Sequence, residues 1–472
     1  MEQDQINRAI DGYLDAHWDQ MVADIDALVR IESVEDKSKA AAGAPFGPGP
    51  REALDTALGM AQEMGFETHD VDGYLGYAEL PGETDGQIGI IGHIDVVLAG
   101  PGWTFPPYQV TRKDGYLLGR GVIDDKGPSV VALHAVKFWK DLQDAGRAER
   151  FPYTVRFLFG ANEETGMGDV EYYRERFADP LFLFTPDAEF PVCYGEKGLY
   201  DGFIEAPVQP DGRIMEFEGG VATNAVPGQA HAIVRADAAA LPAAAGVTVS
   251  AAGEGLARIE GAGKNAHAST PEAGVNAIGV VVDYLLANGL CTDAERAFLE
   301  LDQRLIAHTD GSGLGLACAD EHFGALTVVA GTIRTEGGRF IQSLDSRFPT
   351  STTADEITAK VSAAAQEAGC TYRAGRIDPP FLMDPESPVI QALLRAYNEA
   401  TGEDAKLFTE GGGTYARHFS NAASFGPEKS WVENPAWVGG MHGPDEGVGE
   451  QLLKDAFRIY VLTLEKLMRI EF

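Results

Sequence analysis

Hydrophobic and polar positions along the chain follow both helical and strand periodicity. From Ile6 to Ile31 apolar residues recur three or four positions apart with acidic residues between them, which predicts an amphipathic opening helix. Gln87–Gly92 (QIGIIG) is a short apolar run and predicts a buried strand that ends at His93. A helix is predicted from Gly127 onward, and further strands at 153–159 and 181–184. Strands that alternate with helices predict an α/β fold with a mostly parallel sheet.

The pattern changes beyond about residue 191. Ala- and Gly-rich stretches there alternate with short strand-like segments such as Leu326–Ile333. A helix is predicted again from Pro388, and Leu452–Met468 has the period of an amphipathic closing helix. The change indicates a second domain between two parts of the first.

Composition and charge narrow the classes of partner. The chain has 472 residues, of which 44% are hydrophobic, as expected of a folded globular protein. Its 37 Lys and Arg against 72 Asp and Glu give a net charge of −35. Such a field repels phosphate backbones and anionic lipid and attracts cations, so we expect neither a nucleic-acid nor a membrane partner.

Cysteine usage and the opening segment indicate the compartment. The four cysteines are far apart and form no CxxC pair, which excludes a disulfide framework and a thiolate zinc site. The first residues carry acids where a signal peptide needs a basic and then an apolar region. Since no stretch approaches about 18 strongly apolar residues, we expect a soluble, cytoplasmic protein.

The candidate chemistry lies just after the predicted strands. Each strand end is followed by a carboxylate or an imidazole, and the residues are His93, Asp95, Asp124, Asp125, Glu163, Glu164 and Asp187. Several negative charges in one crevice are too costly unless a cation lies among them. Imidazole and carboxylate ligands without cysteine suit Zn²⁺, Mn²⁺ or Co²⁺. Two ions would need one bridging carboxylate and at least one further group at each ion. That count would be satisfied by His93, Asp124, Glu164, Asp187 and a distant second histidine.

These motifs carry a family resemblance. Gly-His-x-Asp, Asp-Asp-Lys-Gly-Pro and Glu-Glu-x-Gly follow in that order, and Met441-His442-Gly443 closes the series. The chain resembles the M20 metallopeptidases over nearly its whole length, and within them the dinuclear-zinc dipeptidases of the peptidase V and carnosinase-like type. The resemblance implies two divalent ions, with zinc first and manganese or cobalt as alternatives. It implies as ligands His93 and Asp187 for one ion, Glu164 and His442 for the other, and Asp124 as the bridge.

The same resemblance implies catalytic and substrate-binding roles. Asp95 would orient the His93 imidazole, and Glu163 would be the general base, which requires that its own oxygens do not bind metal. His267, in Ala266-His267-Ala268-Ser269, would stabilise the oxyanion. The substrate would be held by Asn224, by Arg347 and by the backbone of Gly411, Gly412 and Gly413.

We therefore expect a mostly parallel catalytic domain formed by residues 1–190 and 385–472, with an α+β lid domain of residues 191–384 inserted in it. Insertion follows because His442 must reach a site otherwise built before residue 190. The predicted function is dipeptide hydrolysis by a water that two metal ions share, in a monomer. The alternatives are an M20-type deacylase acting on N-acyl amino acids and a metal- or peptide-binding protein without catalysis.

Overall fold

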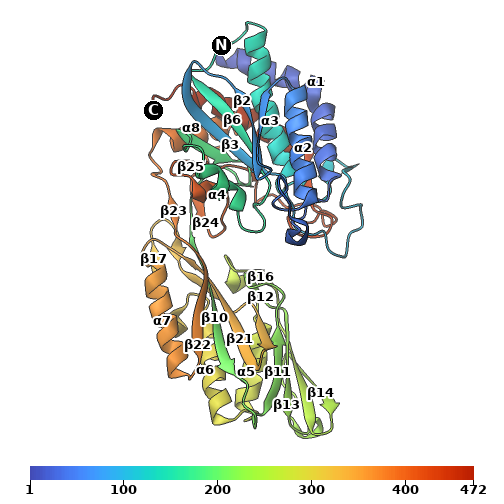
Figure 1. Ribbon diagram of the computed structural model, residues 1–472, viewed down its shortest axis with the longest axis vertical. Coiled ribbons are helices and arrows are strands. Elements are labelled where there is room, and N and C mark those ends of the chain that lie inside the picture. The colour runs from blue at the N-terminus through green and yellow to red at the C-terminus, as the bar shows by residue number, and fades with distance from the viewer. The chain divides into compact units, whose positions relative to one another are not determined.

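The computed structural model describes residues 1–472, and the chain divides into two compact units (Figure 1). Unit 1 comprises residues 1–194, 382–408 and 414–472. Unit 2 comprises residues 195–381 and the short segment 409–413. Unit 2 is thus an insertion in the sequence of unit 1, and a five-residue segment from the C-terminal part of the chain belongs with it.

Unit 1 is built on a mixed sheet with helices packed against it. Its helices are α1 (Gln3–Val29), α2 (Pro48–Glu63), α3 (Lys126–Asp144), α4 (Gly168–Arg174), α8 (Pro388–Thr401) and α9 (Glu450–Leu467). The strands of the large sheet are β1 (Glu67–Val71), β2 (Leu75–Leu80), β3 (Thr84–His93), β6 (Tyr153–Gly160), β7 (Phe182–Thr185), β9 (Cys193–Glu196), β23 (Phe381–Leu382), β24 (Phe408–Glu410) and β25 (Ala422–Ser424). Short strands outside this sheet are β4 (Thr111–Lys113), β5 (Tyr116–Leu118), β8 (Ala188–Glu189), β26 (Pro427–Glu428) and β27 (Gly447–Gly449).

The centre of this sheet is parallel. The strand order is β1-β2-β6-β3-β7-β25-β9-β23, with β24 paired to β9. Strands β6, β3, β7 and β25 run parallel, whereas β1 and β2 join the edge antiparallel. His93 at the end of β3 pairs with Gly160 at the end of β6, so both strands finish at the same sheet edge. The expected α/β fold class is confirmed, including the parallel centre.

The core of unit 1 follows from the hydrophobic pattern. Helix α1 buries one stripe, including Ile10, Met21 and Ile25, which have no exposed surface. Helix α3 packs on β3 and β6, and α9 packs on α3 and α8. The helices and strands predicted from periodicity in this unit are confirmed, because each buries the apolar face that identified it.

Unit 2 is an antiparallel sheet with helices packed on it. Its large sheet has the order β14-β15-β13-β11-β20-β21-β10-β22, with β19 paired to β21. These strands are β10 (Gly198–Pro207), β11 (Ile214–Gly219), β13 (Gln229–Arg235), β14 (Val247–Gly253), β15 (Leu256–Ala262), β19 (Thr327–Val329), β20 (Ile333–Glu336), β21 (Arg339–Phe348) and β22 (Thr371–Asp378). Two small pairs are β12 (Ala225–Val226) with β16 (Ala266–His267), and β17 (Ala319–Asp320) with β18 (Gly324–Ala325). The helices are α5 (Ala277–Ala287), α6 (Asp293–Ala307) and α7 (Ala354–Glu367), and α5 packs on β13 and β15.

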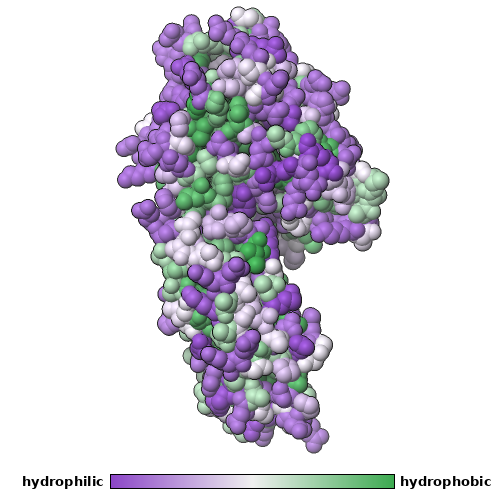
Figure 2. Space-filling model, turned by 60° about the vertical axis from the view of Figure 1, so that its left-hand side comes forward, coloured by the Kyte–Doolittle hydropathy of each residue, from purple (hydrophilic) through white to green (hydrophobic).

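The surface reflects the composition. Figure 2 shows hydrophilic side chains over most of the visible face of both units, with small hydrophobic patches between them. None of the helices combines the length and the apolar character that crossing a bilayer requires.

One buried carboxyl group in unit 2 has no hydrogen-bond partner. Asp302 lies on α6 with 0% of its surface exposed, and neither carboxylate oxygen makes a hydrogen bond. Burial raises the pKa of this carboxyl well above its ordinary value. The folded state therefore keeps a proton that the unfolded chain releases around the ordinary aspartate pKa of about 3.9. The free energy of unfolding is therefore highest below that pH, where Asp302 is protonated in both states. It falls as pH rises towards the folded-state pKa of Asp302.

We predict that Asp302→Asn makes unfolding less sensitive to pH. Between the pKa of Asp302 in the unfolded chain and its pKa in the folded protein, the free energy of unfolding of the wild type should fall with pH by up to about 1.4 kcal/mol per pH unit more than that of the variant. The reason is that Asn cannot ionise. Urea unfolding at pH 5, 6, 7 and 8 measures this difference. Glu300→Gln, at an exposed position on the same helix, is the matched control. An unchanged pH slope in Asp302→Asn would contradict the prediction.

Candidate metal centre

The predicted ligands of unit 1 lie on turns at one edge of the parallel sheet. His93 is the last residue of β3, Glu164 follows β6, and Asp187 follows β7. Because β6, β3 and β7 are parallel neighbours, their carboxyl ends meet at this edge. Asp124 joins them from the turn before α3. The start of α3 and the end of this turn pack tightly on β3, because a Cβ at Gly92 would lie 1.9 Å from the Ser129 hydroxyl and 2.6 Å from Oδ2 of Asp125.

Asp124 lies between two imidazoles. Its Oδ1 is 2.9 Å from Nε2 of His93, and its Oδ2 is 2.9 Å from Nε2 of His442. Glu164 Oε2 is 3.1 Å from the same nitrogen of His442, and Asp187 Oδ2 is 3.7 Å from Nε2 of His93. The structure thus brings together all five predicted metal ligands. The two oxygens of Asp124 face different histidines, which is the arrangement that a bridging carboxylate needs.

The pKa values in this cluster reflect both burial and close ion pairs, and His442 is its one exposed member, with 53% of its side chain accessible. His93 is fully buried; burial lowers the pKa of its imidazole, but hydrogen bonds to Asp124 and Asp95 and the charge of Asp187 raise it to a net value well above the ordinary one. The pKa of His442 rises to about 11 because this imidazole is hydrogen-bonded to Asp124 and Glu164. Burial raises the pKa of Asp187 to about 7. Burial also acts to raise the pKa of Asp124, but its hydrogen bonds to the two histidines bring it below the ordinary range.

These side chains fit divalent ions. His93, Asp124 and Glu164 form one group whose ligand atoms lie within 4.8 Å of one another, and His93, Glu163 and Asp187 form a second. Neutral imidazole and carboxylate oxygen are ligands that Zn²⁺, Mn²⁺ and Co²⁺ accept. The raised pKa values favour protons on the two histidines, which offset part of the negative charge of the carboxylates, and a divalent cation would replace those protons.

Asp95 has further contacts besides the predicted one. Its carboxylate lies 3.5 Å from Nδ1 of His93, and its backbone oxygen is closer to that nitrogen, at 3.0 Å. The two carboxylate oxygens accept hydrogen bonds from the backbone amides of Glu163 and Glu164, both at 3.1 Å. Asp95 therefore holds the Glu163–Glu164 turn as well as touching the imidazole.

Two further buried carboxylates, to which the sequence assigned no role, hold backbone of this site. Asp125 accepts a hydrogen bond from the backbone amide of His93 at 3.1 Å. Asp169 accepts from the amides of Ala161 and Asn162, just before Glu163, at 2.7 and 3.0 Å. The doubled aspartate at 124–125 was a signal for the first. Nothing in the sequence around Asp169 distinguishes it from a solvated helix acid.

Asn224 and His267, both in unit 2, lie side by side. Strands β12 and β16 pair Ala225 with His267, and the backbone oxygen of Asn224 accepts from the amide of Ala268 at 2.9 Å. Nδ1 of His267 accepts a hydrogen bond from the amide of Ser269 at 3.2 Å. In a neutral ring that bond assigns the proton to Nε2, so His267 has a donor on its outer nitrogen.

Arg347 and the glycine run also come together in unit 2. The Arg347 guanidinium binds the Asp345 carboxylate through Nε and Nη2, at 2.8 and 3.0 Å, and its Nη1 donates to the Gly411 carbonyl at 3.3 Å. Gly411 also lies against the His267 loop, because a Cβ there would be 2.9 Å from Cβ of Ser269. Gly412 and Gly413 follow in the same segment, which belongs to unit 2. Of the five guanidinium donors these contacts use three, so Arg347 keeps capacity for a carboxylate.

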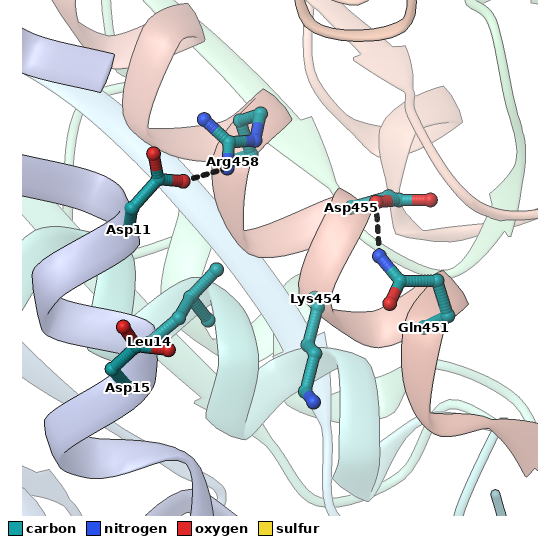
Figure 3. Close-up of a pocket in the computed structure, with 7 residues that line it drawn as sticks. All are labelled: Asp11, Leu14, Asp15, Gln451, Lys454, Asp455 and Arg458. Carbon is teal, nitrogen blue, oxygen red and sulfur yellow. Dashed lines mark hydrogen bonds and ion pairs between the residues drawn. The ribbon is translucent and has the colours of Figure 1, made fainter. Parts of the chain in front are cut away.

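A separate hollow lies between helices α1 and α9 of unit 1 (Figure 3). Its walls carry paired charges: Arg458 forms an ion pair with Asp11, and Gln451 donates to Asp455. None of the predicted site residues lines it. Its polar groups largely bind one another, so the hollow is not a candidate for the chemistry above.

Comparisons with known proteins show the family and the fold of the chain. The profile described as "Peptidase family M20/M25/M40" matches residues 89–466. A Staphylococcus haemolyticus (strain JCSC1435) protein named "Putative dipeptidase" is 31% identical over 95% of this chain and 97% of its own. The crystal structure of human carnosine dipeptidase 1 aligns with a TM-score of 0.58 at 17% identity, over 98% of this chain and 100% of that one. The di-peptidase Dug1p from Saccharomyces cerevisiae aligns with a TM-score of 0.61 at 11% identity, over 98% and 99%. The two structures show a shared fold.

We predict that zinc binding to the metal-free protein at pH 7 releases at least about two protons per chain, because both imidazoles must lose a proton to become ligands and Asp187, whose pKa is about 7, is partly protonated. The pKa of His93 is raised, and that of His442 is about 11, so both histidines hold their protons at this pH. Calorimetric titration in two buffers of different ionisation enthalpy counts the protons. His442→Asn should lower the count, and His69→Asn, at a partly exposed histidine elsewhere in unit 1, should not. Zinc binding without proton release would contradict the assignment.

Proposed function

The chain belongs to peptidase family M20/M25/M40, and on that premise we propose that it is a metal-dependent dipeptidase. It hydrolyses the peptide bond of dipeptides in the cytoplasm, as a monomer. The observation that carries this proposal is Asp124, whose two carboxylate oxygens each lie 2.9 Å from a different histidine. Relatives named dipeptidases, aligned over almost their entire length, support the substrate class.

The ligands divide between two ions. His93 and Asp187 would hold one ion, Glu164 and His442 the other, and Asp124 would bridge them, which the distances in the cluster support. Zinc is our first choice, and manganese and cobalt suit the same ligands. Two such ions, when bound, supply Lewis acidity that polarises a carbonyl and lowers the pKa of a water molecule.

Glu163 is the proposed general base. It takes a proton from the attacking water and returns it to the leaving amine. Burial, and after it the charge of Asp187, raises the pKa of Glu163 well above that of an ordinary glutamate. A raised pKa makes the Glu163 carboxylate a stronger base towards the attacking water than an ordinary surface glutamate. Asp95 holds this turn by accepting hydrogen bonds from the amides of Glu163 and Glu164.

The residues of unit 2 bind the substrate in this proposal. His267 donates from Nε2 to the oxyanion of the tetrahedral intermediate, a role that the hydrogen bond at its Nδ1 supports. Asn224, its neighbour on the paired strands, contacts the peptide. Arg347 and the backbone amides of Gly411, Gly412 and Gly413 bind the substrate carboxylate, a role that the contact between Arg347 and Gly411 supports.

We predict that Glu163→Ala abolishes turnover while both metal ions still bind. The loss of kcat should be at least about 10²- to 10⁴-fold, the usual contribution of a general base. Dipeptide assays give kcat, and elemental analysis of the dialysed protein gives the metal content. Glu171→Ala, at an exposed glutamate on α4, should change neither. Loss of metal from Glu163→Ala would instead make Glu163 a ligand.

We also predict that dipeptides with a free amino terminus are hydrolysed faster than the same peptides with an acetylated one. N-acyl amino acids should be poorer substrates still. Assays of the three compound sets at equal concentration separate the dipeptidase from a deacylase of the same family. Preference for N-acyl amino acids would establish the deacylase, and binding of two metal ions without hydrolysis of any set would establish a non-catalytic protein.

A further inference from the structure

The turn that carries Asp124 and the loop that carries His442 contain no helix or strand of their own. Residues 119–125 are turns and bends before α3, and residues 440–445 form turns before β27. Yet Oδ2 of Asp124 lies 2.9 Å from Nε2 of His442. Strands β5 and β27 pair Leu118 with Gly447, and the Gly119 amide donates to the Glu446 carbonyl at 2.9 Å, so this small sheet aligns the two segments only where they begin and end. Beyond that point other contacts must hold the Asp124 turn against the His442 loop.

Arg120 and Glu446 connect the two segments. Glu446 has 0% and Arg120 has 1% of its surface exposed. Oε2 of Glu446 accepts a hydrogen bond from Nη1 of Arg120 at 2.5 Å. Oε1 of the same carboxylate accepts hydrogen bonds from the backbone amides of Gly121 and Ile123, at 2.9 and 3.2 Å. Arg120 Nη2 in turn donates to the Gly443 carbonyl, at 3.3 Å, next to His442.

The His442 loop also has backbone conformations that need support. His442 and Asp445 have φ angles of 62° and 55°, in the left-handed region that residues other than glycine seldom adopt. Such conformations persist where the surroundings hold them. The Arg120–Glu446 pair begins directly after this loop and reaches back to Gly443 inside it.

We propose that Arg120 and Glu446 are positioning residues for the metal centre. Their buried ion pair keeps the Asp124 turn and the His442 loop in register, so that the ion assigned to Asp124, Glu164 and His442 binds tightly. The pair touches neither ligand side chain and acts through the backbone that carries them. The inference rests on the proposed function only in its assignment of that ion.

The test is a zinc titration of Arg120→Met and Glu446→Gln in competition with a chromophoric chelator. We expect two zinc ions per chain in the wild type, and in each variant about 10- to 100-fold weaker binding of one of them, the range found for residues that support metal ligands. Arg120→Lys keeps the charge but lacks the two guanidinium nitrogens that donate to Glu446 and Gly443, so it should recover part of the zinc affinity. Dipeptide turnover by the variants should recover as the zinc concentration is raised.

Arg156→Met is the matched control. Arg156 is 7% exposed in the same unit and forms an ion pair with Glu79 at 2.8 Å, without contacting either ligand segment. The Arg156→Met variant should have a lower unfolding temperature than the wild type and the same affinity for both zinc ions. If Arg120→Met does not fold, Glu446→Gln decides the question, because Gln keeps the shape of Glu and still accepts hydrogen bonds.

Two outcomes are distinguishable. Wild-type affinity for both zinc ions in Glu446→Gln, with an unfolding temperature lowered as in Arg156→Met, would overturn the positioning role and leave a purely structural pair. A wild-type protein that binds two zinc ions but hydrolyses no dipeptide would instead overturn the proposed function, and the titration would still test the role of the pair.

Discussion

The arrangement of unit 1 depends on the cost of placing several carboxylates together away from water. Asp124, Glu164 and Asp187 lie around two imidazoles, and Glu163 lies beside them. Like charges at such separations repel strongly in a medium of low dielectric constant, and each also loses hydration. Protons or divalent cations must neutralise them. A protein whose overall charge is −35 would not concentrate further negative charge in its interior without such a counter-charge.

Carboxylates also hold the backbone that carries these ligands. Asp95 binds the amides of the Glu163–Glu164 turn, Asp125 the amide of His93, and Glu446 the amides of the Asp124 turn. The sheet by itself positions only His93, at the end of β3. Each hydrogen bond satisfies a buried amide that no strand or helix pairs, and it links one ligand segment to another. The ligand segments thus support one another.

Unit 2 gathers a different set of side chains. His267 lies on β16 and Asn224 directly precedes the paired strand β12, and Arg347 contacts Gly411 although the two residues are 64 positions apart in the sequence. Imidazole, amide and guanidinium groups are donors, and unit 1 contributes mainly acceptors. Donors recognise carbonyl and carboxylate oxygens of a peptide, whereas acceptors hold cations. This division of chemistry suits a hydrolase, although the fold alone would serve many reactions.

The sequence alone was sufficient for the long helices, the central strands and the five side chains that the structure brings together at the candidate metal centre. The spacing of apolar residues is a local property of the sequence, and α1, β3 and α3 each bury the face that their apolar residues define. Motif order then placed His93, Asp124, Glu164 and Asp187 at the ends of predicted strands. Only the tertiary structure decided which carboxylates bind metal-site imidazoles and which bind backbone amides. Asp95, Asp125, Asp169 and Glu446 share the chemistry of the ligands, and no spacing separates them. The partner of a buried charge is set by contacts between segments far apart in the chain, such as Gly119–Ile123 with Glu446, and those contacts exist only once the chain has folded.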